Sequence, residues 1–257
     1  MDIHVLASGS TGNATYIAMG DAKILIDAGI STRRIQQSLK KLGTDIAELD
    51  GILLTHEHRD HIYGLETLLK RYEIPVYATA KTWDAMYLRD KVPQTAFREL
   101  MPQVAVKDMR IEPFRISHDA ADPVGYCLYG EGAKCSMVTD LGFVTEGVQQ
   151  ALALSDVLVL ESNHDVEMVE KGSYPWHLKR RILSNRGHLS NMDAGWLLTR
   201  LQRKTHTHVF LAHMSQENNT PERAEETVKS VLESQNIAGE FSLHLTYPDA
   251  ISSLNAG

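Results

Sequence analysis

The segment that decides the fold is Thr55-His56-Glu57-His58-Arg59-Asp60-His61. It holds three histidines and one aspartate within six residues, in the pattern His-x-His-x-Asp-His. The apolar run from Ile52 to Leu54 predicts a buried strand, so the polar residues begin where that strand ends. At a strand end the regular alternation of side chains stops, and several of them can converge on one point. Imidazole nitrogens and carboxylate oxygens are ligands of Zn²⁺, Mn²⁺ and Fe²⁺, so the segment predicts a metal site.

Three further residues with metal-binding side chains also follow predicted strands. The strands are expected at residues 109–117, 135–138 and 208–212, and the residues that follow them are His118, Asp140 and His213. Each alone is an ordinary turn or core residue. Because binding sites are built where strands end in loops, we expect the three to join the histidine segment.

The composition is that of a folded globular protein. The chain has 257 residues, of which 43% are hydrophobic and 23% are charged; these values exclude a disordered chain, a collagen and a coiled coil. The length suits one large domain or two small ones. No apolar run approaches the roughly 18 residues of a membrane span, so we expect no membrane partner. The formal net charge of −7 argues against a non-specific nucleic-acid coat but allows a local basic groove.

Two features of the chain predict a cytoplasmic location. Met1 to His4 have neither the basic start nor the apolar stretch of a secretory signal. The two cysteines, Cys127 and Cys135, are too few to staple a domain of this size, which fits a reducing compartment. They flank a predicted hairpin turn, so they either face each other across it or, as we favour, are two small core residues.

Strand and helix patterns alternate along the chain without a linker or an internal repeat. Strands predicted at residues 3–7, 15–18 and 24–27 are separated by Gly, Asn and Asp, which indicates an antiparallel meander. Helices are predicted to begin after Ser31 and Thr220, where a hydroxyl precedes apolar residues of helical period, and another is predicted at 82–88. This mixture predicts sheets that pack together with helices on the outside.

The order of the histidine segment, His118, Asp140 and His213 resembles that of the metallo-β-lactamase superfamily over nearly the whole chain. Two shorter motifs are similar to its compact YycJ/WalJ-type branch, which is related to ribonuclease Z and ribonuclease J: Leu6-Ala7-Ser8-Gly9-Ser10-Thr11-Gly12-Asn13 and Gly187-His188-Leu189-Ser190-Asn191. The resemblance implies an α+β fold, a four-layer αββα sandwich formed by a single domain over residues 1–257. Only 72 residues separate Asp140 from His213, too few for the domain that β-CASP nucleases insert there.

The resemblance also implies a site for two divalent metal ions, with Zn²⁺ expected first and Mn²⁺ or Fe²⁺ as alternatives. One ion would be held by His56, His58 and His118. The other would be held by Asp60, His61 and His213, with Asp140 bridging the two.

Such a site suits the hydrolysis of phosphodiesters. Paired ions lower the pKa of bound water, and a metal-bound hydroxide can then attack phosphorus while the ions stabilise the entering and leaving oxygens. Asp60 would orient that water as well as bind metal. By resemblance to the related nucleases, His188 would protonate the leaving oxygen, and His164, which closes another predicted strand, would contact the phosphate during catalysis. The branch implies a 5′ to 3′ DNA exonuclease.

Several polar residues are candidates to bind the substrate: Ser8, Ser10, Asn13, Asn163, Ser190, Asn191 and Ser215. The Gly-rich turn from Ser8 to Asn13 either cradles a phosphate with N–H groups or is a plain hairpin turn. Ser190 and Asn191 precede a predicted helix, where a cap and a phosphate site are compatible. Five basic and no acidic residues lie between Lys171 and Gly187, which indicates either a nucleic-acid track or a solvated helix face.

Two other enzyme functions use the same metal ligands. One is hydrolysis of a thioester, lactone or β-lactam, which leaves His188 and the basic segment without a role. The other is RNA processing, since no residue decides DNA over RNA and only the resemblance favours DNA. A non-catalytic binding module is disfavoured by the complete ligand set. A single domain would bind nucleic acid alone or as a homo-oligomer that extends the groove.

Overall fold

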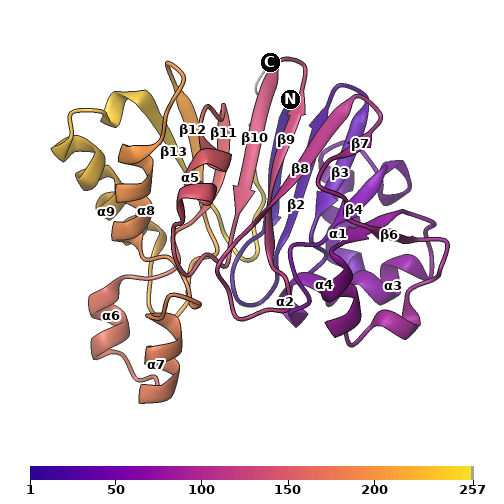
Figure 1. The fold of residues 1–257 in the computed structure, drawn as a ribbon, viewed down its shortest axis with the longest axis horizontal. Helices are drawn as coiled ribbons and strands as arrows, with labels where there is room; N and C mark the ends of the chain where they lie inside the picture. Colours follow the sequence, from indigo (N-terminus) through magenta and orange to yellow (C-terminus); the bar gives the residue numbers. More distant parts are fainter. Residues whose placement is uncertain (256–257) are drawn as a thin grey trace.

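Two seven-stranded sheets pack face to face, and helices cover both outer faces (Figure 1). The protein is described by a computed structural model that covers residues 1–255. In spatial order, the first sheet contains β14 (Ser252–Asn255), β1 (Asp2–Ala7), β2 (Ala14–Met19), β3 (Ala22–Ile26), β4 (Gly51–Leu53), β5 (Val76–Ala78) and β6 (Phe97–Glu99). The second contains β13 (Phe241–Leu245), β12 (Thr207–Ala212), β11 (Val157–Glu161), β10 (Ala133–Val138), β9 (Val124–Gly130), β8 (Met109–Arg115) and β7 (Val104–Val106).

The helices fall into two groups, which Figure 1 places on opposite sides of the paired sheets. Beside the first sheet lie α1 (Thr32–Lys41), α2 (Arg59–Ile62), α3 (Leu65–Leu69), α4 (Ala80–Ala85) and the 3-10 turns η1 (Ile46–Glu48) and η2 (Arg89–Lys91). Beside the second lie α5 (Glu146–Leu152), α6 (Val166–Lys171), α7 (Trp176–Ile182), α8 (Asn191–Arg200), α9 (Pro221–Ser234) and η3 (Ala238–Glu240). Within residues 1–255, none of these helices combines the length and apolarity that crossing a membrane requires.

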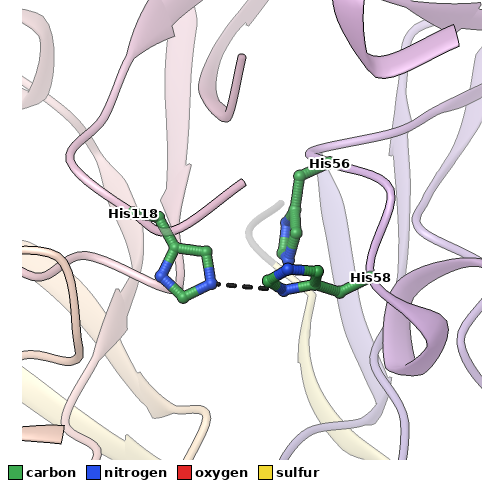
Figure 2. A group of neighbouring side chains, drawn as sticks. All are labelled: His56, His58 and His118. Carbon is green, nitrogen blue, oxygen red and sulfur yellow. Dashed lines mark hydrogen bonds between the residues drawn. The ribbon is translucent and has the colours of Figure 1, made fainter. Parts of the chain in front are cut away.

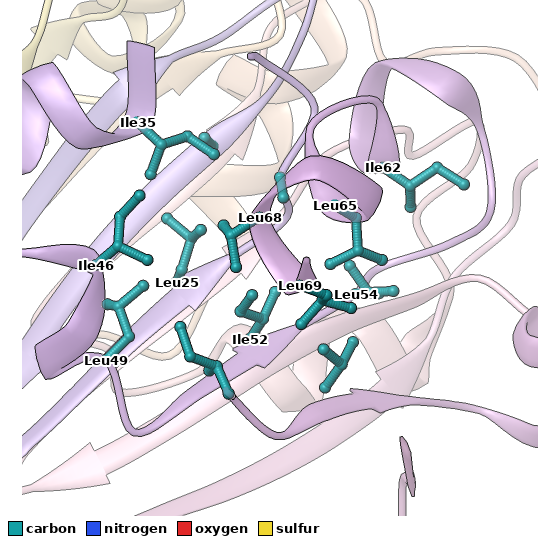
Figure 3. Close-up of a cluster of buried hydrophobic side chains, with 14 of the residues drawn as sticks. Leu25, Ile35, Ile46, Leu49, Ile52, Leu54, Ile62, Leu65, Leu68 and Leu69 are labelled. Atoms are coloured by element: carbon teal, nitrogen blue, oxygen red, sulfur yellow. The ribbon is translucent and has the colours of Figure 1, made fainter. Parts of the chain in front are cut away.

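The alternation of side chains along buried strands produces the four layers. On β11, Val157 and Val159 lie in the apolar core between the two sheets. Leu158 lies in the core beneath the outer helices, with residues of α5, α8 and α9. On the other side, α1 and α3 pack against β3 and β4, for example through Ile35 and Leu68 (Figure 3). Because both faces of these strands are apolar, both faces need a covering layer.

Most predicted elements are confirmed, and the differences are shifted element ends and short elements that were not predicted. The meander β1–β2–β3 is antiparallel as predicted. The helix predicted at 82–88 instead covers Ala80–Ala85, because the hydroxyl of Thr79 caps it by accepting from the N–H of Thr82. Several short elements of six residues or fewer were not predicted, namely β6, β13, β14, α2, α6, η1, η2 and η3. Cys127 lies opposite Ser136 on the neighbouring strand and therefore points away from Cys135; both are buried free thiols.

Strand direction places the loops that carry the histidines at one edge of the second sheet. Strands β10, β11 and β12 are parallel to one another. Strand β8 runs the same way, because β8 and β10 are both antiparallel to β9. In the first sheet, β3 and β4 are likewise parallel, and the histidine segment follows β4. The carboxyl ends of these strands are where the predicted ligands begin.

Candidate metal centre

Three imidazole rings from two distant segments form the first group of candidate ligands. His56 and His58 lie in the loop after β4, and His118 lies after β8. Figure 2 shows the three rings turned toward one another, and Nε2 of His118 lies 3.4 Å from Nδ1 of His58. One nitrogen from each ring can be chosen so that all three lie within 4.8 Å of one another.

Asp60, His61 and His213 form a second group of the same kind. Asp140 lies between the two groups. Its carboxylate oxygens are 3.1 Å from Nε2 of His61, 3.5 Å from Nδ1 of His213 and 3.7 Å from Nε2 of His118. The structure thus brings all seven predicted ligands to one place, with Asp140 between the two groups.

The spacing and the unused atoms of these residues fit bound divalent ions. With ligand bonds of about 2.1 Å, two ligands of one tetrahedral ion lie about 3.4 Å apart, and the ligand atoms around Asp140 lie 3.1 to 3.7 Å from it. Nε2 of His56 and Nε2 of His213 are buried and have no hydrogen-bond partner within residues 1–255. A buried polar atom without a partner is costly, and metal coordination would remove that cost.

The electrostatics of the site favour a positive charge. Burial alone would lower the pKa of His61, but the carboxylates of Asp27, Asp140 and Asp60 outweigh it and raise that pKa well above its ordinary value. His213 behaves in the same way: burial is outweighed by Asp140, Asp60 and Glu161, and its pKa rises to about 10. The negative potential that attracts a proton to these rings also attracts a metal ion, which competes with the proton.

Asp27, which was not predicted as part of the site, lies behind the candidate ligand His61. It follows β3, is fully buried, and its Oδ2 accepts from Nδ1 of His61 at 2.8 Å. Its Oδ1 accepts from the backbone N–H of Thr55 at 2.9 Å. The first contact fixes which ring nitrogen of His61 carries the proton and leaves Nε2 for the metal site. The only signal in the sequence is an acidic residue directly after an apolar strand.

Glu161 is a second missed residue, at the end of β11. Its Oε1 accepts from Nδ1 of His188 at 3.0 Å and from Nδ1 of His213 at 2.8 Å. Its Oε2 accepts from the N–H groups of Leu141 and Leu189. Burial alone would raise the pKa of Glu161, but the two histidines hold it well below its usual value. A buried carboxylate at the end of an apolar run is again the only signal.

His188 and His164 lie beside the candidate ligands but in different surroundings. His188 lines the cleft around the ligands, which has a volume of about 260 Å³, and also a neighbouring cavity of about 460 Å³. His164 lines only that neighbouring cavity, together with Ser190. Burial lowers the pKa of His164 to about 4, so its ring is uncharged at neutral pH. Its Nδ1 has no hydrogen-bond partner within residues 1–255.

The predicted substrate-binding residues divide into two sets. Ser10, Asn163 and Ser215 line the cleft. The others are used inside the protein: Ser8 Oγ accepts from the N–H of His213, and the Asn13 amide contacts Gly9 and His61.

Ser190 Oγ caps α8 by accepting from the N–H of Asp193, and the buried Asn191 exchanges hydrogen bonds with Ser162 and Asn219. A substrate contact by Ser8, Asn13, Ser190 or Asn191 therefore stays a prediction.

The Gly-rich turn supports the loop that carries Asp60. The N–H of Asn13 donates to the carbonyl of Asp60, and the N–H of Gly29 donates to the carbonyl of Asn13. A Cβ on Gly29 would lie only 1.6 Å from the Asp60 carbonyl oxygen, so this close approach requires glycine.

The basic segment partly faces the cleft. Arg181 of α7 lines it and forms two hydrogen bonds with Asp119, at 2.6 and 3.1 Å. Lys171 pairs with Glu167 on the surface of α6. Trp176 is 72% exposed, and Trp196 lines the cavity beside His188. Within this segment, one guanidinium is thus placed to meet an anionic substrate.

Comparisons with known proteins agree with this geometry. Residues 22–214 match the family model described as "Beta-lactamase superfamily domain". The chain is 41% identical over 256 residues to exodeoxyribonuclease YycJ of Bacillus anthracis, covering 96% of this chain and 97% of that protein. It is 37% identical over 257 residues to exodeoxyribonuclease WalJ of Streptococcus pneumoniae, covering 97% and 96%. The fold matches that of the metallo-β-lactamase fold protein YhfI from Bacillus subtilis with a TM-score of 0.72, at 14% identity over 97% of this chain and 98% of that one. The predicted sandwich is thereby confirmed, and the chain belongs to the β-lactamase superfamily.

Proposed function

We propose that the protein is a metal-dependent exodeoxyribonuclease that hydrolyses phosphodiester bonds from the 5′ end of a DNA strand. The observation that carries the proposal is the convergence of seven histidine and aspartate side chains at one cleft, which five of them line together with His188. Support for DNA comes from the two relatives, which are named exodeoxyribonucleases and align over nearly their whole length. A DNA substrate also fits the cytoplasmic location expected from the sequence.

The cluster has the donors for two ions, and Zn²⁺ suits its imidazole-rich composition, with Mn²⁺ or Fe²⁺ as alternatives. His56, His58 and His118 would hold one ion, Asp60, His61 and His213 the other, and Asp140 both. Divalent ions bound there would lower the pKa of water and neutralise charge on the phosphate. The exposed part of Asp60 faces the cleft, where its carboxylate can orient the attacking water.

His188 is the proposed proton donor. Glu161 accepts from its Nδ1 at 3.0 Å, so the carboxylate fixes the orientation of the ring. The other ring nitrogen is then the one that can donate to the leaving oxygen. His164, uncharged and with a free Nδ1, is proposed to contact the phosphate from the neighbouring cavity.

Polar groups on the cleft wall are proposed to hold the phosphate oxygens. Ser10, Asn163 and Ser215 offer hydroxyl and amide groups, and Arg181 offers a guanidinium that Asp119 partly neutralises.

The test is a cleavage assay with metal-loaded protein and four end-labelled substrates: single- and double-stranded DNA and RNA. We expect mononucleotides from DNA labelled at either end, with the 5′ label released first. A chromogenic β-lactam is assayed in parallel. Cleavage of the lactam alone would contradict the proposal, and preferential cleavage of RNA would replace its substrate.

Variants separate the roles of the residues. Asp60→Ala and His61→Ala are expected to abolish turnover while the circular dichroism spectrum is kept. His188→Ala is expected to slow cleavage by about 100- to 10,000-fold with metal content unchanged, the usual contribution of a general acid. The matched control is Asp156→Asn. It changes a partly buried carboxylate that accepts from the N–H of Lys134 and does not line the cleft.

A further inference from the structure

Three neighbouring cavities, of which the metal cleft is the first, lie along loops of the first sheet. The cleft shares Ser10 and Asp60 with a cavity of about 350 Å³. That cavity shares Arg59 and Tyr63 with another of about 520 Å³, which α1, α3 and η2 border. Because neighbouring cavities share lining residues, the three lie side by side, beginning at the candidate ligands, and together they are called the groove below.

The far part of the groove is basic although the whole protein is acidic. Four basic residues line its 520 Å³ cavity, Arg33, Arg59, Arg71 and Lys91, and Glu66 is the acidic residue among the lining side chains. Glu66 is already shared by Lys70 and Lys91.

The three arginines have no carboxylate within ion-pair distance anywhere in residues 1–255. In a chain with a formal net charge of −7, three unpaired guanidinium groups around one cavity indicate an anionic ligand.

Aromatic rings accompany these charges. Tyr63 is 50% exposed and Tyr87 is 59% exposed, and both line the cavity. The guanidinium of Arg59 lies 5.3 Å from the centre of the Tyr63 ring, which holds that ring in place. Cations for the backbone and exposed rings for the bases are the combination that single-stranded nucleic acid requires.

We propose that this groove binds the uncleaved part of a single strand whose end lies at the metal centre. Phosphates contact Arg59, Arg33 and Arg71 in turn, and bases stack on Tyr63 and Tyr87. The inference rests on the proposed nuclease function and adds the path of the substrate to it.

The experiment measures binding of a fluorescent phosphorothioate 15-mer, which resists cleavage, to the metal-loaded protein as the salt concentration is varied. Each lost phosphate contact lowers the slope of log affinity against log salt by about 0.7 for a single strand. We therefore expect Arg33→Gln/Arg71→Gln to lower the slope by about 1.4 and to weaken binding about 25-fold at 0.1 M salt. Lys40→Gln/Lys229→Gln removes the same charge from two exposed sites outside the groove and should change the slope little.

Hydrolysis of a dinucleotide, which the cleft alone can hold under the proposal, is measured with the same variants. It should stay at the unmodified rate in Arg33→Gln/Arg71→Gln if the metal centre is intact. Equal slopes for the two double variants would overturn the inference and leave the nuclease proposal standing. Absent hydrolysis of both DNA and dinucleotide in the unmodified protein would overturn the nuclease proposal, whatever the slopes.

Tyr87 gives an independent test of stacking. Tyr87→Ala should weaken 15-mer binding by about 5-fold or more, whereas Tyr87→Phe, which keeps the ring, should bind as the unmodified protein does. Equal binding by Tyr87→Ala and Tyr87→Phe would overturn the stacking role.

Discussion

Replacing Asp27 by asparagine should weaken metal binding at His61 without changing any residue that lines the cleft. The carboxylate accepts at both oxygens, from the N–H of Thr55 at 2.9 Å and from Nδ1 of His61 at 2.8 Å. An asparagine can accept at only one of these positions. If its oxygen faces Thr55, its NH₂ group faces His61, and the ring must move its proton from Nδ1 to Nε2. Nε2 is the atom that lies 3.1 Å from Asp140, in the candidate metal site.

The opposite amide orientation is no better. It keeps the proton of His61 on Nδ1 but sets the NH₂ group against the N–H of Thr55, and leaving a buried donor unpaired costs about 1–3 kcal/mol. The partners behind metal ligands typically contribute 10- to 100-fold in metal affinity. A factor of 10 to 100 corresponds to about 1.4 to 2.8 kcal/mol. This range matches the cost of the unpaired Thr55 donor, which the variant must accept to keep Nε2 of His61 free for metal. We therefore expect a 10- to 100-fold higher Kd for the metal held by His61.

The measurement is a competition titration with a chromophoric chelator, followed by turnover at limiting and at saturating metal. Activity should fall at limiting metal and recover largely at saturation, which a misfolded variant would not do. The matched control is Asp156→Asn, which also loses a carboxylate that accepts from a backbone N–H, at 2.7 Å, but lies away from the ligands. If Asp27→Asn bound metal as tightly as the control, the tautomer argument would be wrong.

Three other outcomes follow from the same contacts. In Glu161→Gln, the NH₂ group faces two of the four N–H donors that the carboxylate accepts from. The folded state should lose about 3 kcal/mol of stability, which lowers the Tm in chelator by about 6–12 °C. An unchanged Tm would contradict the four-donor geometry. Chelation of the unmodified protein should lower the Tm reversibly, by about 2.7 kcal/mol of stability if free metal had been about 100 times the Kd. Burial is the main cause that lowers the pKa of both His208 and His244; His206 adds to it for His208, and His208 adds to it for His244. Nδ1 of His208 lies 3.1 Å from Nε2 of His244. The unfolded chain therefore binds protons first, so stability measured by urea in chelator should fall as pH drops below about 6.5, and His244→Gln should reduce that fall.

The candidate metal ligands were predictable because each has two signals. Each is a histidine or aspartate, and each lies in the loop that follows a predicted strand. Parallel strands end at the same edge of a sheet, so His118, Asp140 and His213 meet although the chain between them is long. The layers were predictable for a similar reason, since apolar residues on both faces of β11 require cover on both sides.

The residues behind the ligands were not predictable from one sequence. Glu161 and Asp27 are single acidic residues at strand ends, a pattern that surface turns also show. Their partners lie far along the chain, at His213 and His61, and nothing local reports them. The role of Asn191 was obscured differently, because a residue at the start of a helix has several roles. Its side chain proves to be one member of a buried network with Ser162.

Backbone conformation at the strand ends explains why the site could not be recognised by its turns. Asp27, Asp140 and His213 all have positive φ, at 59°, 58° and 56°. Glycine would adopt this conformation freely, whereas a residue with a Cβ raises the free energy of the fold by about 1 kcal/mol or more. At each position the left-handed residue ends the strand and directs its side chain toward the other candidate ligands or their supports, so glycine would remove the strain together with that side chain. The N–H of His213 is held by Ser8 and that of Asp27 by the carbonyl of Leu53, which offset part of the strain. Turns with positive φ are usually predicted from glycine. That rule fails at Asp27, Asp140 and His213, because the candidate site requires a side chain at each of them.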